Sequence, residues 1–197
     1  MVKAYYDARA PEYDDWYEGT GLFVDRDRPG WDEEIAALVR TLDELPPRRT
    51  LDVGCGTGFL TRHLRGKLTC LDQSESMLAI AHERVPHADI VRSDAIPLPF
   101  GDGAFERVFT GHFYGHLEEP ERVAFLAEAR RVAQELVVVD ASAAHSPVDV
   151  EWQPRELKDG SRWEVYKRFF TGQGLAAELG GEVLHEGHWF VVVRASA

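Results

Sequence analysis

The chain has 197 residues, of which 44% are hydrophobic and 28% charged, and its formal net charge is −12. This length suits a single domain with a sizeable core. Nucleic-acid binders gain most of their affinity by neutralising phosphates, so the acidic balance argues against DNA or RNA as a substrate. The start of the chain lacks the apolar core of a signal peptide, and no stretch is long and apolar enough to cross a bilayer. Two cysteines outside any C-x-x-C pattern are typical of reduced thiols, so we expect a cytoplasmic protein without a membrane partner.

Residues 1–31 combine aromatic and acidic side chains, and Pro11 divides them into two short helical pieces. Such aromatics either pack an arm against the core or form one wall of an apolar pocket. We predict an N-terminal arm or lid over residues 1–31, followed by the main domain over residues 32–197.

Strands and helices alternate from residue 50 to residue 141. The expected strands cover residues 50–53, 68–71, 88–93, 105–110 and 136–140. Helices are expected over residues 32–45, 75–85 and 120–132. A further helix is expected from the turn after residue 53 to about residue 65. This alternation predicts a parallel sheet with helices on both faces, which binds ligands beyond the carboxyl ends of its strands.

The last part of the chain has weaker patterns. Residues 142–160 are polar and contain two prolines, so we expect a loop or short helix near the cleft. A sixth strand is expected over residues 163–170, a short helix over 171–179 and a seventh strand over 189–194.

Three glycines, at positions 54, 56 and 58, follow the first strand. Glycine has no Cβ, so the backbone of such a turn can approach a ligand closely, and a helix opening there would offer unpaired N–H groups. The dinucleotide fingerprint G-x-G-x-x-G requires a third glycine where Phe59 stands. A turn that merely joins a strand to a helix is the remaining alternative.

The spacing G-x-G-x-G after Leu51-Asp52-Val53 resembles motif I of the class I S-adenosylmethionine (SAM) dependent methyltransferases. Ala10-Pro11-Glu12-Tyr13-Asp14 resembles the Ala-x-x-Tyr-Asp stretch that precedes motif I in many small-molecule members. Asp94-Ala95, followed by Pro99-Phe100 and Asp102-x-x-Phe105, resembles the stretch that recognises adenine. The resemblance implies SAM as cofactor and a Rossmann-like α/β fold. In that fold a seven-stranded, mostly parallel sheet has helices on both faces and an antiparallel last strand.

The positions of Asp72 and Asp94 also suggest nucleoside contacts independently of the resemblance. Asp72 ends the second strand, where nucleotide-binding folds place the acid that accepts hydrogen bonds from ribose, although it could equally cap the next helix. Asp94 offers an acceptor for an adenine amino group beside an apolar wall. With the resemblance, the predicted cofactor-binding residues are Tyr13, Asp52, Gly54, Cys55, Gly56, Thr57, Gly58, Asp72, Gln73, Met77, Asp94, Ala95 and Thr110.

Methyl transfer from a sulfonium is an in-line displacement that depends mainly on positioning. An alcohol or phenol acceptor also needs a general base, for which His112 is the candidate, with Tyr114 beside it. Turnover would then rise with pH through an ionisation near the ordinary histidine pKa. The alternative for His112 is a buried, hydrogen-bonded histidine in a loop.

The sequence lacks the motifs of several other methyltransferase classes, and this narrows the chemical class of the methyl acceptor. The Thr110-Gly111-His112-Phe113 stretch lacks the Asn/Asp-Pro-Pro-aromatic pattern of amide and base-nitrogen methyltransferases, and no Pro-Cys follows. No third ligand joins His112 and His116, so no metal is expected. A small-molecule acceptor, methylated on O or N, remains. A catalytically silent SAM-binding regulator and, less favoured, an NAD(P)-linked oxidoreductase stay open, as does the oligomeric state.

Overall fold

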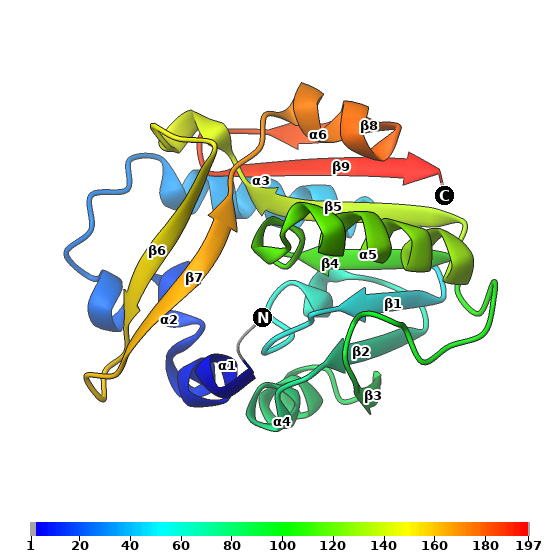
Figure 1. Cartoon of the computed structure of the whole chain (residues 1–197), viewed down its shortest axis with the longest axis horizontal. Coiled ribbons are helices and arrows are strands. Elements are labelled where there is room, and N and C mark those ends of the chain that lie inside the picture. The colour runs from blue at the N-terminus through cyan, green and yellow to red at the C-terminus, as the bar shows by residue number, and fades with distance from the viewer. Residues whose placement is uncertain (1–2, 197) are drawn as a thin grey trace.

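A sheet of seven strands forms the centre of the computed structural model, which describes residues 3–196 (Figure 1). Its order is β3-β2-β1-β4-β5-β9-β8. The strands are β1 (Thr50–Val53), β2 (Leu68–Asp72), β3 (Asp89–Arg92), β4 (Arg107–Gly111), β5 (Glu135–Ala141), β8 (Gly181–Glu186) and β9 (Phe190–Ser196). The first five run parallel, whereas β9 lies antiparallel to both β5 and β8. The predicted fold class is confirmed.

Helices cover both faces of this sheet (Figure 1). On one face, α5 (Glu119–Val132) and α6 (Gly172–Leu179) pack on a cluster that includes Val138 and Val193. On the other face, α3 (Trp31–Asp43) packs on Val137, Val139 and Val192. Successive residues of a strand point to opposite faces, so a strand buried on both sides has to be apolar throughout. The helix α4 (Glu75–Arg84) lies beside β2 and β3.

The region after β5 differs from the prediction. Val150–Glu156 and Arg162–Arg168 form strands β6 and β7 of a separate antiparallel hairpin. The strand expected over 163–170 is present but does not join the main sheet, and the loop or short helix expected over 142–160 is wrong for β6. Pro154 and the charged side chains obscured β6, although Asp159-Gly160 between the strands is a hairpin signal. The missed sheet strand, β8, starts directly after Gly180, whose φ of 70° ends α6.

The helix expected from the glycine turn to about residue 65 is also wrong. Only one turn of 3₁₀-helix forms there, Thr61–His63. Leu64 is already extended, with ψ of 148°, and the carbonyl of Arg65 accepts the N–H of Arg48 at 3.1 Å. The connection between β1 and β2 is short, so its second half has to extend to return the chain to the start of β2.

The N-terminal residues lie at the carboxyl edge of the parallel strands, beside the β6–β7 hairpin (Figure 1). They form α1 (Lys3–Arg9), α2 (Asp15–Glu18) and short 3₁₀ turns. Asp14 accepts hydrogen bonds from the Thr57 hydroxyl at 2.6 Å and from Arg84 at 2.5 Å. The Ser74 hydroxyl donates to Asp7 at 2.6 Å. The arm is therefore anchored to the turn and to α4; that it moves as a lid stays a prediction.

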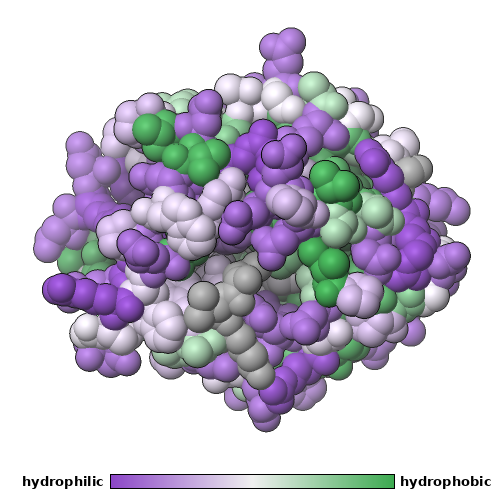
Figure 2. Space-filling model, viewed as in Figure 1, coloured by the Kyte–Doolittle hydropathy of each residue, from purple (hydrophilic) through white to green (hydrophobic). Residues whose placement is uncertain are grey.

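The outer surface fits the charge of the chain. Figure 2 shows a face on which hydrophilic residues predominate and hydrophobic ones occur singly or in small groups. Within residues 3–196, none of the helices has the length and apolar character needed to span a membrane.

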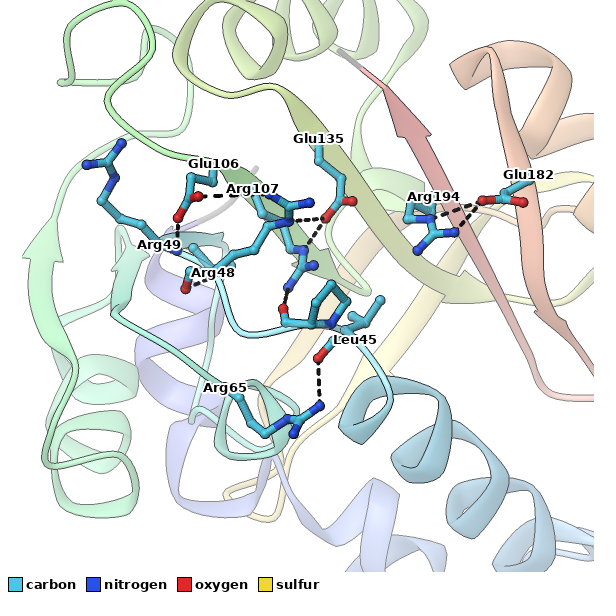
Figure 3. A network of polar contacts seen from close by, with 11 residues as sticks. Leu45, Arg48, Arg49, Arg65, Glu106, Arg107, Glu135, Glu182 and Arg194 are labelled. Carbon is cyan, nitrogen blue, oxygen red and sulfur yellow. Dashed lines mark hydrogen bonds and ion pairs between the residues drawn. The ribbon is translucent and has the colours of Figure 1, made fainter.

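A polar network closes the opposite, amino-terminal edge of the sheet (Figure 3). Arg107, at the start of β4, is fully buried and pairs with Glu135 at the start of β5. It also donates to the carbonyl of Pro46 at 3.1 Å. Arg48 lies 3.8 Å from the same glutamate. A buried charge is tolerated only when it is paired and hydrogen-bonded, so this network depends on every member.

Replacing Arg107 by methionine should reduce the free energy of unfolding by about 3 kcal/mol, because Glu135 loses its buried partner. Urea denaturation measures the change. The matched control is Arg194→Met, which removes an exposed pair with Glu182 (side chains 35% and 63% exposed). That control should cost at most about 1 kcal/mol. Equal losses in the two variants would contradict a special role for the buried arginine.

Candidate active site

The three glycines of the turn have left-handed backbone conformations, with φ of 70°, 53° and 74° at Gly54, Gly56 and Gly58. L-residues other than glycine rarely adopt such angles. A Cβ on Gly54 would also lie 2.8 Å from the ring of Phe113. The turn therefore requires glycine both for its backbone path and for its contact with the loop after β4.

A cavity of about 230 Å³ lies over this turn, beyond the carboxyl ends of β1, β2 and β4. Eight of the predicted cofactor-binding residues form part of its wall: Tyr13, Gly54, Gly56, Asp72, Gln73, Met77, Asp94 and Ala95. The structure thus brings together residues from the arm, the turn, α4 and two loops. Leu71, Ile96, Phe113 and Leu117 add an apolar lining that suits a flat ring.

Asp72 occupies the floor of this first cavity. Its two carboxylate oxygens accept the N–H groups of Gly56 at 3.0 Å and Ser74 at 2.9 Å. Burial raises the pKa of this carboxyl, while the backbone hydrogen bonds lower it. Ser74, not Asp72, caps α4, because its hydroxyl accepts the N–H of Met77 at 3.2 Å. Each carboxylate oxygen keeps a second lone pair, so Asp72 can still accept from a ligand.

The other five predicted cofactor-binding residues lie outside the wall of this cavity: Asp52, Cys55, Thr57, Gly58 and Thr110. Two of them stabilise the glycine turn and its neighbours through hydrogen bonds. The Thr110 hydroxyl donates to the carbonyl of Val53 at 2.8 Å, and Thr57 anchors the arm through Asp14. Their direct contact with a cofactor stays a prediction.

Asp52 is the one carboxyl among these five residues, and its pKa is shifted. Burial raises its pKa to about 7; the charge of Asp72 adds to the shift, and the hydrogen bond from the Thr61 hydroxyl opposes it. That bond to Oδ2 measures 2.6 Å, whereas Oδ1 is buried without a partner in the described part of the chain. Asp52 therefore holds the short turn after the glycines rather than reaching the cavity.

Phe59 explains why the dinucleotide fingerprint is absent. Its ring stacks on Tyr17 of the arm, with ring centres 3.9 Å apart and planes 8° from parallel. The position that the fingerprint reserves for glycine is thus filled by an aromatic contact that docks the arm.

A second cavity, of about 320 Å³, adjoins the first on the side of the arm and the hairpin. Tyr6, Tyr13 and His112 belong to the walls of both cavities, so the two spaces meet at these side chains. Sequence reasoning missed Arg9 and the hairpin residues Arg155 and Lys167, which line this space. No local signal marks them, because only the unpredicted hairpin brings β6 and β7 to the arm.

His112 stands at the junction with a left-handed backbone, φ of 55°, and its N–H donates to the carbonyl of Val139 at 2.9 Å. Burial lowers its pKa to about 3, and the positive charge of Lys167 adds to this, whereas Asp140 opposes it. Nδ1 lies 4.0 Å from a carboxylate oxygen of Asp140. Nε2 is buried and has no hydrogen-bond partner among residues 3–196. Burial therefore favours the neutral imidazole, whereas the sequence led us to expect an ionisation near the ordinary histidine pKa.

Tyr114 does not reach this space. Its side chain is fully buried between Phe125 and Phe170, and its hydroxyl donates to Glu178 at 2.7 Å. It lines neither cavity, so its predicted place beside His112 in the site has no support from the geometry. Successive residues of this loop point in different directions, which the sequence alone does not reveal.

Metal ligands are not clustered in the described chain: residues 3–196 contain no group of three or more His, Cys, Asp or Glu arranged to hold an ion.

Comparison with known proteins agrees with this geometry. A family model described as a methyltransferase domain matches residues 50–135. The solved structure of a DhpI–SAH complex is 25% identical, with a TM-score of 0.72, and the match covers 97% of this chain and 92% of that one. These matches support a class I SAM-dependent methyltransferase domain. The CcbJ methyltransferase from Streptomyces caelestis, 20% identical over 98% of both chains with a TM-score of 0.64, shares the fold.

Matches to curated relatives cover a smaller part of this chain. The demethylmenaquinone methyltransferase of Renibacterium salmoninarum is 31% identical over 147 residues, which are 72% of this chain and 59% of the relative. The enzyme of the same name from Thermotoga maritima is 33% identical over 107 residues, 52% of this chain and 44% of the relative. The chain thus spans about half the length of the curated relatives it matches.

The low pKa of His112 can be observed directly. Its imidazole nitrogens should stay neutral in ¹⁵N-resolved NMR spectra between about pH 5 and pH 8, with His112→Asn identifying the signal. Because the unfolded chain regains the ordinary pKa of 6.5, the neutral ring contributes full stability above that value and loses it as pH falls toward about 3. A titration midpoint near the ordinary value would contradict the burial described.

Proposed function

We propose that the protein transfers a methyl group from SAM to a small-molecule acceptor. The observation that carries this proposal is the meeting of two cavities at Tyr6, Tyr13 and His112. A methyl donor in one cavity and an acceptor in the other would face each other across this junction. In-line transfer depends on holding the two reactants in such an arrangement, which supplies roughly 7–11 kcal/mol of the barrier.

SAM fits the first cavity by the chemistry of its wall. Asp72 offers lone pairs to the ribose hydroxyls, and Asp94 lies at the rim beside the apolar Ala95 and Ile96, where adenine would bind. Gly54 and Gly56 leave room for the methionine part, because a Cβ at Gly56 would lie 3.6 Å from the ring of Tyr13, in the space between turn and arm. A structural neighbour solved as a DhpI–SAM–HEP complex, 24% identical with a TM-score of 0.72 over 97% of this chain, holds SAM on the same fold.

The acceptor would occupy the second cavity, under the arm and the hairpin. Aromatic side chains form much of its wall, among them Tyr5, Trp16, Trp31 and Phe169. Trp16 and His112 lie edge to face, with ring centres 5.0 Å apart. These walls keep water from the reacting atoms, which favours transfer to the acceptor over hydrolysis of the sulfonium.

Whether a proton has to be removed decides the role of His112. A hydroxyl acceptor loses its proton as the new bond forms, and the unpartnered Nε2 of the neutral ring is the available base at the junction. The ring is already neutral and needs no ionisation to accept a proton, but a pKa of about 3 makes it a weak base, so it suits an acidic hydroxyl such as a phenol best.

Asp72→Ala should weaken SAM binding by about 1.5–3 kcal/mol, or roughly tenfold to a hundredfold in dissociation constant, because ribose hydroxyls lose a charged acceptor. Isothermal titration calorimetry measures this. Asp89→Ala, which removes an exposed carboxylate on the neighbouring strand β3, is the matched control and should bind SAM normally. Unchanged affinity in a folded Asp72 variant would remove the ribose contact from the proposal.

His112→Asn should lower turnover of a hydroxyl acceptor about a hundredfold or more, while SAM affinity stays nearly unchanged. Asparagine tolerates the left-handed backbone of this position, so the loop should keep its shape. The wild-type rate should show no rise with pH near the ordinary histidine value. His82→Asn, on the exposed side of α4, is the control. A mutant that keeps full turnover would leave His112 with positioning alone.

A further inference from the structure

The wall of the second cavity has a charge opposite to that of the protein. The chain carries a net charge of −12, yet this wall contains five cationic and only two acidic side chains: Arg9, Arg26, Arg28, Arg155 and Lys167 against Asp27 and Glu151. A cavity lined by one sign of charge attracts ligands of the other sign.

Three of these cations already have partners or lie at the margin. Lys167 pairs with Asp140 at 2.6 Å. Arg28 donates to the carbonyl of Trp16 at 2.6 Å and lies over the ring of Trp31. Arg26 is exposed and lies over Phe23. None of the three therefore has to hold a ligand.

Arg9 and Arg155 are near enough for their charges to act on each other, and within residues 3–196 neither has a carboxylate at ion-pair distance. Arg9, from α1, donates to the hydroxyl of Tyr5. Arg155, from β6, donates to the side-chain carbonyl of Gln153, which in turn bonds Glu151. The Nε–H of Arg155 is buried without any partner in the described chain. Two guanidinium groups thus share one cavity without a counter-ion.

Such an arrangement is costly unless a ligand completes it. Desolvated charges of the same sign repel, and a buried donor without an acceptor loses the hydrogen bond that water would supply. Burial lowers the pKa of Arg155, and the neighbouring charge of Arg9 lowers it further. An anion between the two side chains would remove both penalties.

We propose that the methyl acceptor carries an oxyanion, a carboxylate or a phosphonate, which Arg9 and Arg155 bind in the second cavity. This inference rests on the proposed methyl transfer. A guanidinium can donate two parallel hydrogen bonds to two oxygens of either group, which an ammonium cannot. Arg9 also lies over Tyr13, with Cζ 5.0 Å from the ring centre, and Tyr13 belongs to both cavities. The anion is therefore held close to the junction where the methyl group arrives.

The body of the acceptor is apolar or aromatic. Tyr5, Tyr6, Trp16 and Phe169 belong to the same cavity wall as the two arginines. A flat acid such as benzoate combines the two features that this wall selects, and phenylphosphonate presents the same body with a phosphorus oxyanion.

The test measures binding of benzoate and of phenylphosphonate to protein saturated with S-adenosylhomocysteine, by calorimetry, against benzamide as the neutral isostere. Both acids should bind at least about tenfold more tightly than benzamide. Arg9→Gln and Arg155→Gln should each abolish most of that preference, and Arg155→Lys should restore part of it. Arg162→Gln, which removes an exposed cation of the same hairpin, is the matched control and should behave as wild type.

Affinity for S-adenosylhomocysteine and the melting temperature, measured on every variant, separate the two proposals. If the nucleoside ligand fails to bind the wild type, the proposed methyl transfer itself is wrong. If it binds but benzamide binds as well as the two acids, or the arginine variants keep the preference for acids, the oxyanion site is refuted. A preference for only one acid supports the site and tells carboxylate from phosphonate.

Discussion

The buried carboxylate of Asp140 holds the second cavity together. From the end of β5 it accepts the N–H groups of Gly115 at 2.7 Å and Ala141 at 2.8 Å, and it pairs with Lys167 of the hairpin. Burial alone would raise the pKa of this carboxyl, but the charge of Lys167 keeps it below its ordinary value. A single charge thus connects the sheet, the loop after β4 and β7. Removing either partner would leave an uncompensated buried ion.

The Asp140–Lys167 pair also determines which charged groups of the second cavity can contact a ligand. Because Asp140 neutralises Lys167, the remaining positive charge of the cavity belongs to its four arginines, of which Arg9 and Arg155 form the proposed anion site. The same local field keeps His112 neutral, since Lys167 adds to the burial that lowers its pKa. The proposed acceptor site thus combines a positive anchor and a neutral imidazole beside one buried ion pair. The net charge of the whole chain says nothing about this cavity.

The polar groups at the two edges of the sheet differ in what they contact. At the amino-terminal edge, Arg107 pairs with Glu135 and donates to the carbonyl of Pro46, although its Nη2 is buried without a partner in the described chain (Figure 3). These charges serve stability. At the carboxyl edge, Asp72, His112 and Arg155 keep lone pairs or N–H groups that no side chain of the described chain uses. Parallel strands place all their carboxyl ends on one side, which brings Asp72 and His112 to the cavities, and the hairpin adds Arg155 there.

Sequence reasoning succeeded where the signal is local. The apolar run Thr50–Val53, the three glycines after it and Asp72 at the next strand end identified the turn and the first cavity. It failed where a partner distant in sequence decides the outcome. The hairpin was missed because its strands are half-exposed and pair only with each other, and Tyr114 was misplaced because the loop's packing sets its direction.

By itself, the sequence determined the class of fold, the glycine turn and the carboxylate that faces it. These depend on periodicity and on backbone conformations that few residue types allow, and both can be recognised in short stretches. Only the tertiary structure decided that Arg9 and Arg155, from opposite ends of the chain, share one cavity and that His112 is neutral. Burial and charge pairing depend on what surrounds a side chain in space, and those neighbours come from segments that no local pattern connects.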